Sequence, residues 1–542
     1  MGASGHRTRR SSLPLAAVAV VAAASLAACS GGSEAEQPPV TRATVAPRVT
    51  LGDGIDRGDP EPSDSTGSTP TSDGDPAPVP DVEPLDYSIV FEDRGNGVES
   101  GTITVPVDYA DPQGDTLDLF VTRHRAPDDT RIGVMFANNG GPGFPASSMA
   151  ANVRGWFGDP LIERFDIVSW DPRGTGESGA SVDCIGDADY DRFFASSDVT
   201  PDDDAERQAL IDLSRDFAEA CIESVGAPLS HLGTNNSARD MDAIRQALGE
   251  EQASYLGFSY GSELGAVWAT LFPDTVRAAV LDGAAHPDAD SLRPITEQRL
   301  GFERVLNTFL ADCSADESCA FHNGGDAEGA FDRLLASLDE SPIPSVEGRP
   351  AVNLEVAING VIQAMYTDRR WPALQRALAD AQNGDGEGLL ALHDSYFQRD
   401  PATGTYSDVL ESFQAINCAD DPDRLTPDES DAEAEALVGV APRLFPYTTG
   451  SYTCDFFPAS DDPRAEITGD RAGPIMVVGT TGDPSTPLES SAAMADALDE
   501  GFLVTVEANQ HTAYRTGDCI NGLVDRYLVF LEVPDGDART CS

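Results

Sequence analysis

The hydrophobic positions of this chain fall into two kinds of short run, which predict two kinds of strand. Residues 101–107 and 117–122 alternate apolar and polar side chains, as half-exposed antiparallel strands do. Six further runs are almost continuously apolar, which is typical of central parallel strands buried on both faces; they cover 132–137, 165–170, 253–258, 277–281, 474–479 and 502–506. Helical patterns lie between several of these runs. The order predicts an α/β fold with an eight-stranded, mostly parallel sheet and an antiparallel start.

The alternation of strands and helices stops between about residue 286 and residue 473. Apolar side chains recur there every three or four residues, which predicts helices over 297–311, 327–338, 354–365 and 373–381. We therefore expect a mostly helical cap over 286–473, inserted between the sixth and seventh predicted strands. The core of the fold then consists of two parts, residues 86–285 and 474–542.

The first 28 residues have the pattern of an export signal. A stretch with three arginines at 7–10 precedes an apolar run over 13–28, which is too short to span a membrane. The run ends in Leu-Ala-Ala-Cys29, which resembles the lipobox of bacterial lipoproteins, so Cys29 is the predicted lipidation site. The alternative is a plain secretory leader with an incidental cysteine. The protein is expected on the outer face of the cell membrane as a lipoprotein, or secreted.

Residues 29–85 have the composition of a disordered tether. Pro, Ser, Thr, Asp and Gly dominate this segment, and it contains no aromatic residue. Such a segment cannot bury enough apolar surface to offset the entropy lost on ordering. We expect it to link the leader to the folded part of the chain.

Charge and cysteine content narrow the classes of partner and compartment. The 542 residues carry 35 Lys plus Arg against 92 Asp plus Glu, and this net charge of −57 excludes nucleic-acid partners.

Eight cysteines remain beside Cys29, and an even number in an exported chain predicts disulfides. Spacing alone does not fix their connectivity. We expect pairing between neighbours: Cys184 with Cys221, Cys313 with Cys319, Cys418 with Cys454, and Cys519 with Cys541. None has the C-x-x-C spacing of zinc sites, so no metal site is predicted.

A glycine-flanked serine marks the first candidate for chemistry. Gly257-Phe-Ser259-Tyr-Gly261 lies where the buried run 253–258 ends and a helical pattern begins. A nucleophile elbow needs that position, because two glycines allow a sharp turn that exposes the serine hydroxyl above the sheet. The bare pattern is weak, and the alternative is an ordinary glycine-rich turn. The flanking strand and helix favour the elbow, so Ser259 is the predicted nucleophile.

A serine hydroxyl needs a base, usually a histidine that a carboxylate orients. In folds of this class the chain order is Ser, then acid, then His. His511 is the one histidine that follows the last predicted strand, so it is the predicted base. Asp483, directly after the run 474–479, is the predicted acid. Asp282, at the end of the preceding strand, is its rival.

The oxyanion of an acyl-transfer intermediate needs backbone N–H donors. Tyr260 follows the nucleophile at the start of a helix and is one predicted donor. The other is Gly140 or Gly141, in the glycine-rich loop after the third predicted strand. A loop at this position supplies the second donor in lipases and esterases.

Together these motifs resemble the α/β-hydrolase fold, and more closely the prolyl-iminopeptidase-like serine peptidases with their exported tripeptidyl-aminopeptidase-like branch in actinobacteria. The resemblance covers residues 87–542. It implies Ser259 as nucleophile, Asp483 as orienting acid, His511 as base, and a TAP-like C-terminal part over 474–542. The motifs that carry it are Asn139-Gly-Gly-Pro-Gly, Asp171-Pro-Arg-Gly-Thr-Gly-Glu-Ser, Thr234-Asn-Asn-Ser-Ala-Arg-Asp, Gly257-Phe-Ser-Tyr-Gly-Ser, Gly482-Asp-Pro-Ser-Thr-Pro and Gln510-His-Thr.

The resemblance also implies a substrate, with two departures. Members of the family cleave dipeptides or tripeptides from free N-termini, and the ammonium group there needs a buried carboxylate partner. Glu263, Asp420 and Asp421 are the candidates. This chain has Asn139 where relatives commonly have histidine, and Glu263 where an aromatic residue is frequent. Both departures bear on the substrate rather than on the triad.

Three functions compete on this basis. The leading hypothesis is an exported, lipid-anchored serine exopeptidase that acts on peptides through an acyl-enzyme, needs no cofactor and is expected to be a monomer. A cell-envelope carboxylesterase or lipase with the same triad is the alternative, because fold and triad do not fix the acyl substrate. The third hypothesis is a non-catalytic surface binding lipoprotein.

Overall fold

The structure is a computed structural model that describes residues 87–288 and 292–542. The predicted leader, Cys29 and the predicted tether lie outside the described residues. The described part belongs to one compact unit, residues 85–542. None of its helices has the length and apolar content that crossing a membrane requires.

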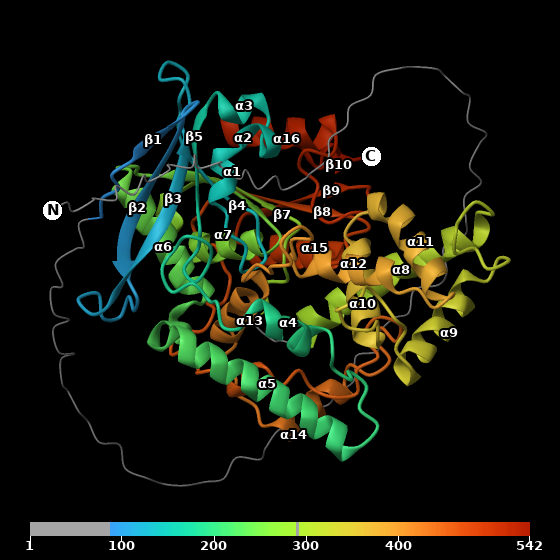
Figure 1. The fold of residues 1–542 in the computed structure, drawn as a ribbon. Helices are drawn as coiled ribbons and strands as arrows, with labels where there is room; N and C mark the ends of the chain where they lie inside the picture. Colours follow the sequence, from blue (N-terminus) through green and yellow to red (C-terminus); the bar gives the residue numbers. More distant parts are fainter. Residues whose placement is uncertain (1–86, 289–291) are drawn as a thin grey trace, which may run out of the picture. The chain divides into compact units, whose positions relative to one another are not determined.

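A single sheet runs through the described part of the chain (Figure 1). Its strands lie in the order β1-β2-β3-β5-β4-β6-β7-β8-β9-β10. The pairs β1–β2, β2–β3 and β3–β5 are antiparallel, and all the others are parallel. The strands are β1 (Glu92–Gly95), β2 (Val98–Pro106), β3 (Thr116–His124), β4 (Gly133–Asn138), β5 (Phe165–Trp170), β6 (Ala253–Phe258), β7 (Val276–Asp282), β8 (Ile475–Thr480), β9 (Gly501–Val506) and β10 (Thr540–Cys541).

The sheet has ten strands within the described residues, so the predicted count of eight was wrong. The eight predicted runs correspond to β2–β9. The two additional strands are the edges, and neither has a hydrophobic signal. All four residues of β1 are exposed. The two-residue strand β10 is too short to show any periodicity.

Helices cover both faces of the sheet, and the central strands are therefore buried on both sides. Every residue of β4, β5, β6 and β8 is buried. Successive side chains alternate between two hydrophobic clusters, as in β6, where Tyr255 belongs to one cluster and Leu256 to the other. The first cluster includes α6 (Thr234–Ala247), α7 (Tyr260–Leu271) and α15 (Leu488–Ala497). The second includes α1 (Ser147–Ala151), α3 (Asp159–Ile162) and α16 (Asp518–Phe530).

Between β7 and β8, the residues that the structure describes form helices and contribute no strand to the sheet. Side chains of α8–α12 form a third hydrophobic cluster, around residues such as Phe309, Phe331 and Ile358. The helices here are α8 (Leu292–Ala315), α9 (Ala327–Glu340), α10 (Leu354–Met365), α11 (Trp371–Ala381), α12 (Glu387–Tyr396), α13 (Val409–Asp420) and α14 (Pro427–Glu435). Figure 1 shows α8–α12 gathered to one side of the sheet. We call residues 292–473 the β7–β8 insertion. The predicted division of the chain into domains at 285 and 474 stays a prediction.

Two shorter connections, β4–β5 and β5–β6, contain the remaining helices, and four disulfides cross-link the described chain. The helices are α2 (Val153–Trp156), α4 (Asp187–Phe194) and α5 (Asp204–Val225). All four neighbouring cysteine pairs are bonded as predicted: 184–221, 313–319, 418–454 and 519–541. The last pair ties the edge strand β10 to the start of α16, and the third ties the end of α13 to the 3₁₀ turn Cys454–Phe456.

Candidate active site

Ser259 occupies a sharp turn between β6 and α7. Its φ of 56° and ψ of −125° are backbone angles that L-residues rarely adopt. The two glycines of the motif make room for this turn. A Cβ at Gly257 would lie 2.2 Å from the carbonyl oxygen of Gly261, and a Cβ at Gly261 would lie 2.8 Å from that of Asn138. The Ser259 N–H also donates to the carbonyl of Asp282 at 2.9 Å, which holds the elbow against β7.

Asp483 and His511 meet across the loops that follow β8 and β9. The Nδ1 atom of His511 lies 2.9 Å from both carboxylate oxygens of Asp483. Asp483 is 2% exposed, and its Oδ1 also accepts the backbone N–H groups of Ser485 and Thr486 at 3.0 and 2.9 Å. The hydroxyl of Thr486 donates to Oδ2 at 3.2 Å. This network assigns the ring proton to Nδ1, which leaves Nε2 free to accept a proton.

The β7–β8 insertion helps to hold the histidine in place. The backbone N–H of His511 donates to the carbonyl of Tyr366 at 3.0 Å. Thr367 and Gln510 form an isolated antiparallel bridge beside this bond. The rings of Tyr366 and His511 pack edge to face, with centroids 5.6 Å apart. Tyr366 therefore fixes both the backbone and the ring of His511.

The pKa of His511 is raised above its ordinary value. Burial by itself lowers it, but the charge of Asp483, the hydrogen bond from Nδ1 to Asp483 and the charge of Asp282 together outweigh burial. All three favourable contributions stabilise the imidazolium form. These contacts therefore favour a proton on the ring of His511.

Asp282 lies close to the histidine loop but does not orient the ring. Its carboxylate accepts the backbone N–H groups of Ala513 and Tyr514 at 2.8 and 2.7 Å. Burial raises the pKa of Asp282 to about 6, against the opposing effect of these two N–H donors. Asp282 thus clamps the backbone that follows His511, and the contact to the ring comes from Asp483.

One cavity contains both Ser259 and His511. Its volume is about 290 Å³, close to the lower end of the range of about 300–1,000 Å³ that is usual for ligand pockets. It lies at the carboxyl edge of the parallel strands, where α/β folds place their ligands. The residues that line it are Asn139, Gly155, Trp156, Phe258, Ser259, His511, Thr512, Tyr514 and Arg515.

The glycine-rich loop after β4 lies directly against the elbow. A Cβ at Gly140 would lie 2.4 Å from the carbonyl oxygen of Phe258 and 2.9 Å from the Cβ of Ser259. The N–H of Gly140, however, donates to Oδ1 of Asn138 at 2.8 Å. It is therefore already engaged, which leaves Gly141 as the loop's candidate donor. Tyr260 begins α7, where the first N–H groups of a helix have no partner within the helix.

The three carboxylates considered for the substrate amine do not line this cavity. Glu263 forms an ion pair with Arg464 at 2.8 Å. Asp420 accepts the backbone N–H and the hydroxyl of Thr234, and that hydroxyl is also 2.7 Å from the hydroxyl of Tyr260. The structure therefore brings Glu263 and Asp420 together around Arg464, since the charges of both act on its pKa.

Asp421 lies apart from this group. Its carboxylate accepts the backbone N–H of Asp423 at 2.8 Å, and its charge acts on Arg424 and Asp455 rather than on Arg464. Asp421 therefore belongs to the turn after α13.

The Asp171 motif stabilises the backbone next to the glycine-rich loop. Asp171 is buried and accepts the backbone N–H groups of Ser147 and Glu177, at 2.9 and 3.0 Å. Arg173 and Asp240 form a fully buried ion pair with two hydrogen bonds of 2.6 and 2.8 Å. These contacts hold the loop beneath the glycine-rich segment and the start of α6, and none of them involves the cavity.

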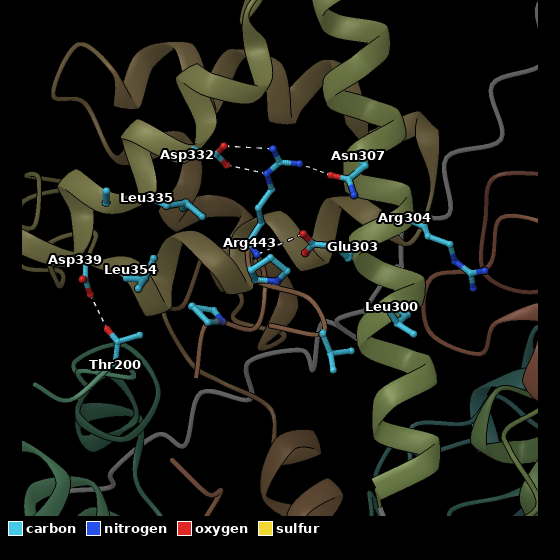
Figure 2. A pocket seen from close by; sticks show the side chains of 14 residues that line it. Thr200, Leu300, Glu303, Arg304, Asn307, Asp332, Leu335, Asp339, Leu354 and Arg443 are labelled. Carbon is cyan, nitrogen blue, oxygen red and sulfur yellow. Dashed lines mark hydrogen bonds and ion pairs between the residues drawn. The ribbon is translucent and has the colours of Figure 1, made fainter. Parts of the chain in front are cut away.

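The β7–β8 insertion contains a larger cavity of about 830 Å³, shown in Figure 2. None of the predicted site residues lines it. Several of its polar groups are already paired: Arg443 binds Asp332 and Asn307, and Glu303 accepts the backbone N–H groups of Arg443 and Leu444. Arg304 binds Glu489, which does not line the cavity. A cavity without free, convergent polar groups is a weaker candidate for catalysis than the smaller one beside Ser259.

Comparison with known proteins agrees with this geometry. Residues 135–323 match the family described as alpha/beta hydrolase fold, and residues 446–541 match the family described as TAP-like protein. The serine protease Hip1 of Mycobacterium tuberculosis is 35% identical, covering 82% of this chain and 87% of Hip1. Carboxylesterase B of the same species is 32% identical, covering 81% and 85%. A tripeptidyl aminopeptidase of Streptomyces lividans is 29% identical, covering 80% and 81%.

This chain therefore belongs to the α/β-hydrolase family and is a serine hydrolase. Within the family it belongs to the branch with a TAP-like C-terminal region, together with the serine protease Hip1. The TAP-like match begins at residue 446, before β8, so it extends further toward the N-terminus than the predicted part 474–542.

Sequence reasoning missed several residues that complete the site. Tyr366 contributes a backbone carbonyl, which any residue type could supply. Trp156, Tyr514 and Arg515 line the cavity, but they lie outside the recognised motifs. Thr486 was within the Gly482-Asp-Pro-Ser-Thr-Pro motif. A hydroxyl three residues after the predicted acid is the one signal that could have pointed to it.

Proposed function

We propose that this protein is an exported serine exopeptidase that removes short peptides from free N-termini through an acyl-enzyme. The observation that carries the proposal is the arrangement around the small cavity. Ser259 and His511 line the same cavity, and His511 is held through Nδ1 by the buried Asp483. The names of two relatives, a serine protease and a tripeptidyl aminopeptidase, support peptides as the substrate.

The reaction begins when Ser259 Oγ attacks the carbonyl carbon of the scissile bond and His511 Nε2 takes the hydroxyl proton. Asp483 stabilises the imidazolium that forms. The tetrahedral oxygen accepts hydrogen bonds from the N–H groups of Tyr260 and Gly141. His511 then gives the proton to the departing amine, which leaves an acyl group on Ser259. A water molecule activated by His511 hydrolyses this ester and restores the free hydroxyl.

Recognition of the substrate's ammonium group is assigned to Glu263 and Asp420. The charges of both carboxylates act on one guanidinium, that of Arg464, so two acids are served by a single cation. The hydroxyl of Tyr260 joins this group to the elbow through Thr234. Asp421 is not retained, because its contacts lie elsewhere.

The alternative function is hydrolysis of a carboxylic ester by the same triad. It is supported by Carboxylesterase B, which is 32% identical over most of both chains. An ester has a better leaving group than an amide and makes the same demands on the serine, the base and the oxyanion donors. The two functions therefore differ in the acyl and leaving groups that the site accepts.

The location proposed for the enzyme is the outer face of the cell membrane. The support is the sequence Leu-Ala-Ala-Cys29 at the end of an apolar leader. Lipidation of Cys29 is the means of attachment proposed, and secretion without a lipid is the alternative. Four disulfides in the described chain agree with an oxidising compartment.

Hydrolysis of matched substrates tests the proposed function. The substrates are aminoacyl, dipeptidyl and tripeptidyl p-nitroanilides with free or acetylated N-termini, together with p-nitrophenyl esters. Ser259→Ala serves as the catalytic control. We expect kcat/KM to be highest for free-amine peptide anilides, and the Ser259→Ala variant to be inactive.

Two outcomes reject the proposal. Turnover of esters with inert anilides transfers the assignment to the carboxylesterase. Equal behaviour of the wild type and Ser259→Ala removes the acyl-enzyme altogether and supports a binding protein instead.

A further inference from the structure

The cavity beside Ser259 has one wall that the acyl-enzyme mechanism does not use. Thr512, Tyr514 and Arg515 form it, directly after His511 in the chain, and Gly155 and Trp156 of α2 also line the cavity. Arg515 is the one Arg or Lys among the residues that line this cavity. The acyl-enzyme mechanism gives this cation no role.

Two hydrogen bonds hold Arg515, one from its backbone and one from its side chain. Its backbone N–H donates to Oδ1 of Asn521 at 2.6 Å, and its Nη1 donates to the carbonyl of Phe157 at 2.7 Å. Asp282 fixes the preceding backbone through Ala513 and Tyr514. An arginine has five N–H donors, so a single bond from Nη1 leaves most of them available. The guanidinium is thus anchored and still able to bind a ligand.

The backbone around Arg515 is also unusual. Among the described residues nine non-glycine residues have a positive φ, and three of them line this one cavity: Ser259, Thr512 and Arg515, with φ of 56°, 64° and 73°. Non-glycine residues rarely adopt such angles, and they gather at functional sites where the surrounding structure enforces them. Thr512 and Arg515 therefore share with the elbow a backbone conformation that the surrounding contacts must impose.

No carboxylate of the described residues lies within ion-pair distance of the Arg515 guanidinium. The acid whose pKa Arg515 affects is Asp525, and the carboxylate of Asp525 is engaged by the hydroxyl of Tyr514 at 2.8 Å. In a chain of net charge −57 most carboxylates on a ligand are repelled. A local cation at the cavity reverses this repulsion where the substrate binds.

The mechanism places the leaving group on this side. His511 donates its proton to the departing nitrogen, so that nitrogen must lie beside the ring. In a leaving amino acid the α-carboxylate is only two bonds from that nitrogen. Arg515 lines the same cavity of about 290 Å³ as His511, so a carboxylate on the leaving residue comes close to the guanidinium. Arg515 is exposed, so the pair forms in contact with water and has the strength of a single charge-assisted hydrogen bond.

We propose that Arg515 forms a subsite for a carboxylate carried by the leaving residue. That carboxylate is either the α-carboxylate of a C-terminal residue or the side chain of an Asp or Glu directly after the scissile bond. The proposal rests on the proposed function, since it assumes an acyl-enzyme at Ser259. The subsite predicts a preference for short or acidic peptides, which the triad alone would not produce.

Four leaving groups on one acyl peptide test the subsite. They are glycine with a free carboxylate, glycine amide, glutamate amide and p-nitroaniline. The acyl peptide is the best one found with the anilides. The variants are Arg515→Gln, which removes the charge, and Arg515→Lys, which keeps it. Hydrolysis of the anilide, whose leaving group has no carboxylate, shows that each variant is folded and that the acyl-enzyme forms.

Arg471→Gln is the matched control. It makes the same change in net charge, and Arg471 pairs with Asp274 at 3.6 Å. Asp274 lies in the 3₁₀ turn Pro273–Thr275 that precedes β7. It is therefore at the amino end of the parallel strands, whereas Ser259 is at their carboxyl end. Loss of the Arg471 charge therefore tests the long-range effect of net charge and leaves the cavity unchanged.

We expect the wild type to prefer free glycine over glycine amide by about tenfold in kcat/KM, the size of one charge-assisted hydrogen bond. Arg515→Gln should reduce this ratio to about one, Arg515→Lys should keep part of it, and Arg471→Gln should keep all of it. The ratio should also shrink in high salt. A matching preference for glutamate amide assigns the subsite to acidic side chains as well; its absence assigns it to chain ends alone.

Two results overturn the subsite while leaving the proposed function intact. One is a wild type that cleaves free glycine and glycine amide equally well. The other is an Arg515→Gln variant that loses the same factor on all four substrates, which indicates a structural role only. Failure of the proposed function is seen separately, as anilide turnover that survives in Ser259→Ala.

Discussion

Gly140 is the residue at which a single added methyl group should be most damaging to this site. Its φ is +92°, and a Cβ there would lie 2.4 Å from the carbonyl oxygen of Phe258. An alanine must displace either the glycine-rich loop or the elbow that carries Ser259. We expect Gly140→Ala to lower kcat/KM by at least about 100-fold, because small displacements of reacting groups have effects of that size. The kcat/KM values for anilide and ester hydrolysis measure this loss.

The matched control is Gly249→Ala. Gly249 also has a positive φ, of +73°, but nothing lies within 4 Å of a Cβ built there. The substitution therefore introduces the backbone strain alone, about 1–2 kcal/mol, and should leave kcat/KM at the wild-type value. Full activity in Gly140→Ala would contradict the close approach of the loop to the elbow.

Under the proposed mechanism, the ionisation of His511 sets the pH dependence of the reaction. Burial lowers its pKa, but Asp483 and Asp282 outweigh burial, and the net shift is upward from 6.5. A base accepts a proton only in its neutral form, so kcat/KM falls as the pH drops through this raised pKa. We expect the acidic limb of the pH profile for a peptide anilide to have its midpoint above 6.5. A midpoint clearly below 6.5 would contradict the favourable contacts at Nδ1.

Removing the carboxylate of Asp483 should change both the rate and this limb. Asp483→Asn eliminates the charge that favours the imidazolium, while the burial that opposes it remains. We expect kcat to fall by about 10³–10⁴-fold and the acidic limb of the residual activity to move to lower pH. Asp496→Asn, an exposed position on α15, is the control and should keep the wild-type profile. An unshifted limb in Asp483→Asn would exclude Asp483 as the partner of His511.

The start of helix α6 depends on an acid from the β7–β8 insertion. The N-cap residue of α6 is Gly233, which has no side chain to cap the helix. A Cβ at Gly233 would lie 2.8 Å from Oδ1 of Asp420, and that oxygen accepts the N–H of Thr234 at 2.7 Å. Asp420 thus takes the place of the missing cap. We expect Asp420→Ala to lower the free energy of unfolding by about 1–2 kcal/mol, measured by urea unfolding.

The pH dependence and a neighbouring residue check this assignment. Burial, and next the charge of Glu263, raise the pKa of Asp420 to about 7. A raised pKa means that the stability Asp420 contributes is complete below its ordinary pKa near 4 and is lost as the pH rises through about 7. The deficit of Asp420→Ala should therefore be larger at pH 4 than at pH 8. Asp421→Ala should change stability little at either pH, and a deficit as large as that of Asp420→Ala would contradict the cap.

The elements differ in how far the sequence could predict them. The central strands were predictable because burial on both faces leaves an unbroken apolar run, as in β4, β5, β6 and β8. The edge strand β1 was not, because all of its residues are exposed and its pairing depends on the backbone. The same holds for β10, which consists of two residues beside β9.

The residues of the candidate site also divide into those that the sequence could predict and those that it could not. Ser259, Asp483 and His511 could be selected from chain order and strand ends, because their side chains are chemically distinctive. The contacts that complete the site come from backbone carbonyls, such as Tyr366 to His511 and Phe157 to Arg515. A carbonyl leaves no mark in the sequence. The bond from the Gly140 N–H to the side chain of Asn138 was hidden for another reason, because it depends on how the loop folds.

The molecule as a whole carries far more negative than positive charge. With 92 Asp plus Glu against 35 Lys plus Arg, repulsion among carboxylates opposes the compact state. Ion pairs on the surface, such as Arg154 with Asp159, relieve this only locally, and each contributes about 0–1 kcal/mol. The net electrostatic effect on stability should therefore be unfavourable at low ionic strength.

Added salt should stabilise this protein because it screens repulsion more than it screens attraction. The Debye length falls from about 30 Å at 0.01 M to about 3 Å at 1 M, so the long-range repulsion of many carboxylates disappears before contacts between paired groups do. We expect the melting temperature at pH 7.5 to rise steadily with NaCl over this range, as followed by circular dichroism. The same titration near pH 4 is the control, because many carboxylates are then protonated and the rise should be much smaller. A melting temperature that falls with salt at pH 7.5 would mean that ion pairs, rather than repulsion, dominate the charge balance of the folded chain.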